Sequence, residues 1–143
     1  MVERFQKDCM YCAHTEKLDA NYIEIESLHV ATVYLARDQT HLGRVAVVLN
    51  WHVDEPFQLT DVERHEFYDD VAHAAEAVEK AVNPGKINYG TYGDTVSHLH
   101  VHVVPKKPGD SDWNDAFVNN PEKPKKLTDS EYEDIINKIK ENL

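Results

Sequence analysis

The stretch SHLHVHVVPK, Ser97 to Lys106, decides the fold because it alternates strictly between histidine and apolar residues. The histidines are His98, His100 and His102, and the apolar residues are Leu99, Val101 and Val103. Successive side chains of a β-strand point to opposite faces, whereas a helix would scatter the imidazoles around its axis. The pattern therefore predicts a strand with an apolar face in the core and three imidazoles on the other face.

The segments around this strand predict an α+β domain. Residues 22–49 hold three apolar, β-branched stretches typical of strands, and residues 86–92 predict another strand. The capping box Thr60–Glu63 predicts a helix that ends at Asn83-Pro84-Gly85, and Thr128–Glu131 opens a final helix. We expect one domain over residues 1–143, with an antiparallel sheet of about five strands and two main helices. Residues 105–127 form a polar, extended segment before the last helix.

Composition and charge exclude several classes of protein. The net charge of −11 disfavours binding to a polynucleotide, whose phosphate backbone attracts basic surfaces. No apolar run reaches the length of roughly 18 residues that a membrane span needs. The first residues, MVERFQKDC, are charged, so we expect no secretory signal and a cytoplasmic location.

Three explanations compete for the histidine row. Chance is a poor one, because histidine is a rare residue and it fills three successive positions of one face. A metal explains at most two of the three, since a strand places His98 and His102 roughly 13 Å apart while zinc ligands lie about 2 Å from the metal. Catalysis is the third, because neutral imidazole is a nucleophile and a proton donor near neutral pH. The central position makes His100 the natural nucleophile.

The row and its surroundings resemble the histidine triad (HIT) family of nucleotide hydrolases and transferases. The motif His98 to Val104 has the family's order of histidine and apolar residues. Residues 93–96, GDTV, are similar to the family's G-Q-[ST]-V, and residues 43–53 are similar to its G-H-φ-L-V-φ-P-K-x-H-V. The resemblance spans about Cys9 to Lys106.

The resemblance implies a mechanism and a set of site residues. His100 would attack the α-phosphorus of a nucleoside phosphoramidate or dinucleoside polyphosphate and form a covalent nucleotidyl-histidine. His102 would hold or donate a proton near the phosphate or the leaving group. The remaining expected contacts to the substrate are Asn88, Thr95, His98 and Trp113. Family members are homodimers, so the resemblance also implies a second copy of the chain as partner.

The pair Cys9 and Cys12, in CMYC, admits a redox motif, a zinc site or two reduced thiols. The βαβ context of a thioredoxin-like redox motif is missing, and CxxC supplies only two of the four ligands of a structural zinc. Bacterial relatives complete such a site with two histidines that correspond to His52 and His98. His14 is the nearest histidine in sequence. If zinc is bound by the first set, His98 is structural and only His100 and His102 act on the substrate.

The sequence departs from the family pattern in places. Asp94 replaces a glutamine and brings a carboxylate toward the phosphate, and Ala36 stands where the family often has a residue that contacts the ribose. Leu49-Asn50 replaces Pro-Lys. These changes leave the base preference open. Two alternatives to the hydrolase remain: a non-catalytic nucleotide-binding regulatory dimer and a hydrolase with zinc at the catalytic centre.

Overall fold

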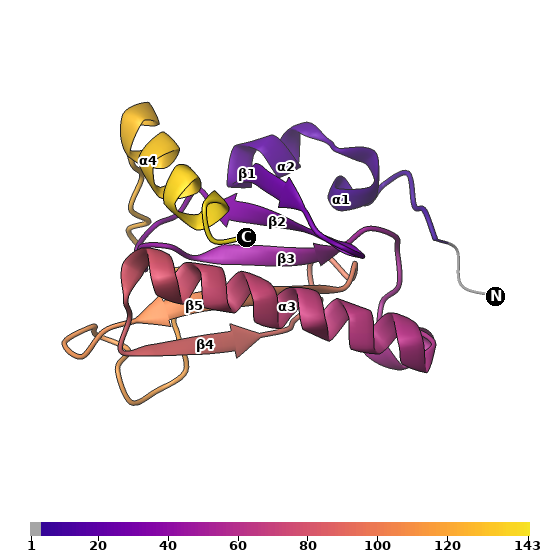
Figure 1. Cartoon of the computed structure of the whole chain (residues 1–143). Helices are drawn as coiled ribbons and strands as arrows, with labels where there is room; N and C mark the ends of the chain where they lie inside the picture. The colour runs from indigo at the N-terminus through magenta and orange to yellow at the C-terminus, as the bar shows by residue number, and fades with distance from the viewer. Residues whose placement is uncertain (1–3) are drawn as a thin grey trace.

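The computed structural model describes residues 4–143, which form one five-stranded antiparallel sheet with helices on both faces (Figure 1). The strand order is β1-β2-β3-β5-β4. The strands are β1 (Tyr22–Ser27), β2 (Ala31–Ala36), β3 (Val45–Leu49), β4 (Lys86–Gly90) and β5 (His100–Lys106). The helices are α1 (Met10–Ala13), α2 (Glu16–Asn21), α3 (Asp61–Val82) and α4 (Asp129–Lys140), with a 3₁₀ turn, η1, at Pro56–Gln58. The expected α+β architecture is confirmed.

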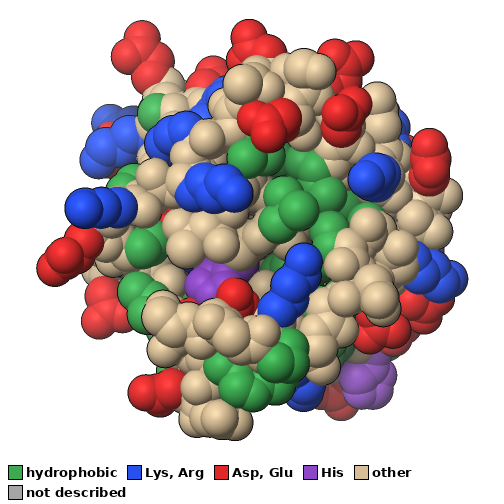
Figure 2. All heavy atoms as spheres, turned by 90° about the vertical axis from the view of Figure 1, so that its left-hand side faces the viewer, with side chains coloured by type: hydrophobic (Ala, Val, Ile, Leu, Met, Phe, Trp, Pro, Cys, Tyr) green, Lys and Arg blue, Asp and Glu red, His purple; other side chains and the backbone are tan. Residues whose placement is uncertain are grey.

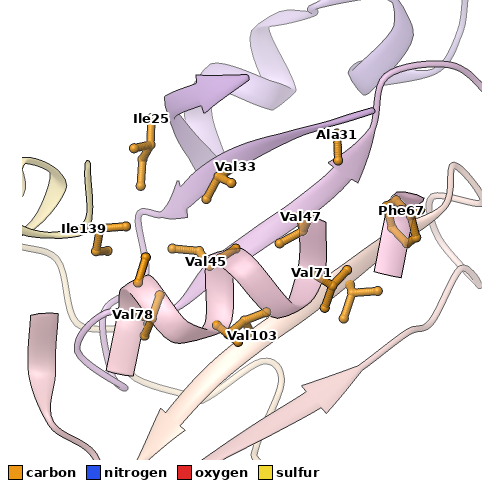
Figure 3. Packing of buried hydrophobic residues seen from close by; sticks show 14 of the residues in the cluster. Ile25, Ala31, Val33, Val45, Val47, Phe67, Val71, Val78, Val103 and Ile139 are labelled. Atoms are coloured by element: carbon orange, nitrogen blue, oxygen red, sulfur yellow. The ribbon is translucent and has the colours of Figure 1, made fainter. Parts of the chain in front are cut away.

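The larger core lies between the sheet and the helices α3 and α4, which lie in front of the sheet in Figure 1. Figure 3 shows Val71 and Val78 of α3 against Val45 and Val103 of the sheet, and all four side chains are buried. A smaller cluster on the opposite face joins Tyr11 and Leu18 of the N-terminal helices to side chains of β2 and β3. Because both faces are covered, every residue of β2 and β3 is buried.

Both predicted capping boxes are present. Thr60 Oγ1 accepts from the Glu63 amide while the Glu63 carboxylate accepts from the Thr60 amide, and Thr128 and Glu131 make the same pair at α4. These reciprocal bonds satisfy amides that have no partner within the helix, which fixes where each helix begins. α3 ends at Asn83, which adopts a left-handed conformation.

The histidine strand differs in one respect from the prediction, because β5 begins at His100 and His98 lies before it. The reason is that β3 ends at Leu49, so the chain before β5 pairs irregularly with the segment that follows β3. Leu99 donates to the carbonyl of Val53 and accepts from the amide of Leu49. The alternation still holds, since Leu99, Val101 and Val103 belong to the large core.

The segment between β5 and α4 contains no helix or strand, yet it is tied to the body of the domain. Lys106, which is buried, donates through Nζ to the carbonyls of Asp112 and Asp115. The imidazole of His41 lies 2.8 Å from the carboxylate of Asp112, and both side chains are buried. The amide of Lys125 donates to Asp38. These ties hold the segment against the loop that joins β2 to β3.

Charged side chains of both signs are interspersed on the face seen in Figure 2, where Asp and Glu occur around the whole outline. This face shows no continuous basic surface, in keeping with the net charge of −11. Within residues 4–143 no helix combines the length and apolar character that crossing a membrane requires.

Candidate functional site

All three histidines of the row are buried, but they serve two different places. His100 and His102 line a cavity of about 730 Å³, whereas His98 does not border it. The rings of His100 and His102 lie 5.0 Å apart, centre to centre, and are almost perpendicular. Tyr11 of α1 packs against the rings of both His98 and His100, at 5.4 Å and 5.2 Å.

The hydrogen bond of His100 assigns its neutral tautomer. Nδ1 lies 2.6 Å from the carbonyl oxygen of His98, and a carbonyl oxygen can only accept, so Nδ1 carries the proton. Nε2 is then the unprotonated nitrogen, with a lone pair available to an electrophile. Burial, together with the charge of Arg44, lowers the pKa of His100, which favours this neutral form.

His102 has the opposite tautomer. Its Nδ1 lies 3.2 Å from Nη2 of Arg44, and a guanidinium group can only donate. Nδ1 of His102 is therefore the acceptor, and Nε2 carries the proton in the neutral ring. Burial, with Arg44 and the neighbouring His100, lowers the pKa of His102 to about 3. At neutral pH this residue is an uncharged hydrogen-bond donor.

His98 completes a cluster of four side chains with Cys9, Cys12 and His52, whose ligand atoms all lie within 4.8 Å of one another. Nδ1 of His98 is 3.4 Å from the Sγ atom of each cysteine, and Nδ1 of His52 is 3.6 Å from Sγ of Cys12. Around a tetrahedral zinc with nitrogen ligands near 2.0 Å and sulfur ligands near 2.3 Å, neighbouring ligand atoms lie roughly 3.5 Å apart. The donor set therefore fits zinc in type, number and spacing.

The tautomers of both cluster histidines also suit a metal. Nε2 of His98 donates to the carbonyl of Leu49 at 2.7 Å, and Nε2 of His52 donates to the carboxylate of Asp54 at 2.9 Å. In each ring the proton is on Nε2, which leaves the Nδ1 lone pair for the cluster. A second hydrogen bond that orients a metal-binding imidazole in this way is usual in zinc sites. His14 ends α1 and lies outside the cluster.

The sequence profile of the HIT domain family matches residues 27–109, which is more than half of the chain and includes the histidine row. The chain belongs to the HIT family. A histidine triad (HIT) protein from Sinorhizobium meliloti 1021 has a similar structure, with a TM-score of 0.81 at 27% identity over 90% of this chain and 95% of that one. A histidine triad protein from Marinobacter aquaeolei VT8 shares the fold, with a TM-score of 0.82 at 20% identity over 98% of this chain and 96% of that one.

A curated relative of the HIT protein is the bis(5'-nucleosyl)-tetraphosphatase [asymmetrical] of Schizosaccharomyces pombe. The two are 30% identical over 86 residues, or 57% of this chain. The chain spans about half the length of that relative, since the match covers 47% of it.

The other predicted substrate contacts of this HIT protein divide between the cavity and more distant places. Thr95 lines the cavity, and so does Asp94, the residue that departs from the family pattern. Asn88 lies in β4 opposite Val104 and does not border the cavity. Trp113 also lies outside the cavity, beside Gly85, which directly precedes β4. Ala36 and Asp38 line the cavity from the end of β2.

The sequence patterns did not single out several residues that the fold brings to His102. Arg44 and Asn119 line the cavity, and Phe117 packs 6.4 Å from the ring of His102. Gly90 makes room for Phe117, because a Cβ atom at this position would lie 2.8 Å from its ring. A charged residue directly before the all-apolar stretch of residues 45–49 could have pointed to Arg44. Nothing local marks Asn119, which comes from the irregular segment after β5, while Phe117 is an aromatic residue of the same segment as Trp113.

Proposed function

We propose that the protein is a nucleotide hydrolase that cleaves at the α-phosphate of a nucleoside phosphoramidate or dinucleoside polyphosphate. The observation that carries the proposal is the pair of complementary tautomers in one cavity. His100 has an unprotonated Nε2, and His102, beside it, has a protonated Nε2. A nucleophile and a hydrogen-bond donor at adjacent positions are what phosphoryl transfer through a covalent intermediate requires.

In the proposed reaction, Nε2 of His100 forms a bond to the α-phosphorus while the bond from phosphorus to the leaving nitrogen or oxygen breaks. The leaving group takes the bonding electron pair and is protonated from water. Nε2–H of His102 donates to a phosphate oxygen, where negative charge grows. Water then attacks phosphorus and gives up a proton to solvent, the N–P bond breaks with its electron pair returning to Nε2 of His100, and a nucleoside monophosphate leaves. Thr95 hydrogen-bonds the phosphate or leaving group from the rim of the cavity.

The test is to incubate the protein with adenosine 5'-phosphoramidate and with diadenosine tetraphosphate, quench in alkaline denaturant, and map adducts by mass spectrometry. We expect product from at least one substrate and a nucleotidyl adduct on His100. The matched control is His100→Asn, which should give neither. Product from His100→Asn at the wild-type rate would overturn the role of His100.

A second candidate is a nucleotide-binding dimer without turnover, which the carboxylate of Asp94 in the cavity favours because it opposes an anionic transition state. Binding of a nucleotide with neither product nor adduct would establish this function instead. Replacement of Asp94 by glutamine would then be expected to tighten nucleotide binding.

We propose that the cluster Cys9, Cys12, His52 and His98 holds a structural zinc ion. Four protein ligands leave no open position for substrate, which argues against zinc as the catalytic centre. Zinc would crosslink α1 to the chain just after β3, at His52, and just before β5, at His98, and so fix Tyr11 against the histidine row. We expect about one zinc per chain by elemental analysis. A reducing, cytoplasmic location goes with this proposal, since the thiols must remain unoxidised.

We infer further that the protein is a homodimer. The outer edge of β4 is unpaired within residues 4–143, and exposed strand edges need cover. Tyr89 of β4 and Tyr68 of α3 are 51% and 62% exposed, which gives this side of the domain an aromatic surface. Light scattering coupled to size exclusion should give twice the mass of the chain, and Tyr89→Arg should shift it to the monomer.

A further inference from the structure

Arg44 is a buried cation beside His102, and its backbone is held in place by the loop between β2 and β3. The residue directly precedes β3 and is only 6% exposed. Its carbonyl accepts from the amide of Ala36 and from the side chain of Gln39. The same Gln39 accepts from the amide of Gly43, which has a positive φ of 97° that glycine tolerates.

The guanidinium group of Arg44 is held by two hydrogen bonds to Asn119, which is far away in the sequence. Nη2 of Arg44 donates to Oδ1 of Asn119 at 2.6 Å, and Nη1 donates to the carbonyl of the same residue at 3.1 Å. The group lies 5.4 Å from the centre of the Phe117 ring, within the range of a cation–π contact. These contacts leave Nη2 directed at Nδ1 of His102.

We propose that Arg44 is a positioning residue that fixes His102 in the Nε2–H tautomer and is itself held by Asn119. The argument is one of hydrogen-bonding capacity. Arginine has five N–H donors and no acceptor, and it is not deprotonated in proteins, so the partner nitrogen of His102 must be the acceptor. A histidine at position 44 could either donate to Nδ1 of His102 or accept from it, whereas an arginine can only donate.

Arg44 also brings a positive charge that forms no ion pair, although this charge interacts with the carboxylate of Asp38 in the same cavity. None of the ion pairs among residues 4–143 includes Arg44. A positive charge at this distance opposes protonation of His102 and favours an anion in the cavity. His102 therefore remains an uncharged donor, and positive charge in the cavity comes from Arg44 beside it and from Lys126. The effect of this charge on a bound phosphate rests on the proposed function, whereas the assignment of the His102 tautomer does not.

The direct test is long-range ¹H–¹⁵N NMR of the imidazole nitrogens in the zinc-loaded protein, with His102→Gln used to assign the signal. We expect His102 to show a protonated Nε2 and an unprotonated Nδ1 between pH 5 and pH 8. The titratable or charged groups that face this ring are Arg44, His100 and Tyr92. A protonated Nδ1 on neutral His102 in the wild type would overturn the proposal.

Variants separate positioning from packing. Arg44→Met fills similar space without charge or donor, and should let the Nδ1–H tautomer appear and raise the pKa of His102 by about one unit. Arg44→Lys keeps a charge and a donor and should retain most of the Nε2–H form. Asn119→Ala should give an intermediate result. Arg64→Met, in α3 and outside the cavity, is the matched control and should leave the His102 signals unchanged.

In kinetics, Arg44→Met should lower kcat by roughly 10²-fold, the lower end of what one positioned hydrogen-bond donor to a growing negative charge contributes. Arg44→Lys should recover part of the loss. An unchanged tautomer and pKa of His102 in Arg44→Met would refute the inference even if activity fell. Failure of the proposed function appears separately, as a wild-type protein without product or adduct on His100.

Discussion

The two ends of the histidine row use the same side chain for different chemistry. At the first end, His98 turns Nδ1 toward Cys9 and Cys12. At the other end, His100 and His102 border the cavity. The residue types do not distinguish the ends. The difference comes from which ring nitrogen makes the hydrogen bond and from its partner: Nε2 of His98 and Nδ1 of His100 each donate to a backbone carbonyl, whereas Nδ1 of His102 accepts from a guanidinium group. The hydrogen bond at one nitrogen thus decides what the other can do.

The largest effect should come from removing the nucleophile at the cavity end. His100→Asn should lower turnover by roughly 10⁴-fold or more, as loss of a nucleophile does in other covalent catalysts. Nucleotide binding and zinc content should remain, because neither depends on Nε2 of His100. Steady-state kinetics, isothermal titration and elemental analysis on one preparation check this. A variant that loses zinc as well would show that the two ends are not separate.

The next effect concerns the other end of the row. Cys12→Ser should lower the zinc content, and the melting temperature should fall by about 5 °C or more, the shift expected from a loss of 1–2 kcal/mol in a domain of this size. Turnover should fall only indirectly, through Tyr11 and α1. His14→Ala, outside the cluster, is the matched control and should keep its zinc. If Cys12→Ser changes neither metal content nor melting temperature, the zinc proposal is wrong.

A smaller effect should follow when only the orientation of a ligand is disturbed. Asp54 accepts from Nε2 of His52, and hydrogen bonds from Ser97 and His52 lower the pKa of its carboxyl group. Asp54→Asn should weaken zinc binding by roughly 10–100-fold, which competition with a chelator would measure. Asp61→Asn, on the exposed first turn of α3, should bind zinc as the wild type does. Equal affinity in Asp54→Asn would exclude an orienting role for this carboxylate.

The last effect is on how the stability depends on pH. His102 has a pKa of about 3 in the folded protein and near 6.5 in the unfolded chain. Between these values only the unfolded chain binds the proton, so this residue makes the free energy of unfolding fall as the pH falls below 6.5. His102→Gln, at saturating zinc, should reduce that slope by about 1.4 kcal/mol per pH unit between pH 4 and pH 6. Denaturant titrations that give the same slope for both proteins would contradict the buried, neutral state of His102.

The sequence predicts the features that depend on local interactions and misses those that depend on contacts between distant segments. Alternation in SHLHVHVVPK predicted the strand faces because side-chain direction is a local property, and the capping boxes predicted both helix starts for the same reason. The start of β5 was misplaced by two residues because it depends on where β3 ends. The contact between Arg44 and Asn119 joins residues 75 positions apart, and one of them lies in a segment without periodicity. No local pattern encodes such a contact.

The most direct test of the division between the two ends is NMR of protein labelled with ¹⁵N-histidine and loaded with ¹¹³Cd in place of zinc, a substitution that thiolate ligands accept. The account predicts one-bond coupling from ¹¹³Cd to Nδ1 of His98 and His52. It also predicts no such coupling to His100, with Nδ1 protonated, or to His102, with Nε2 protonated. Coupling of the metal to His100 or His102, or its absence at His98, would contradict the account.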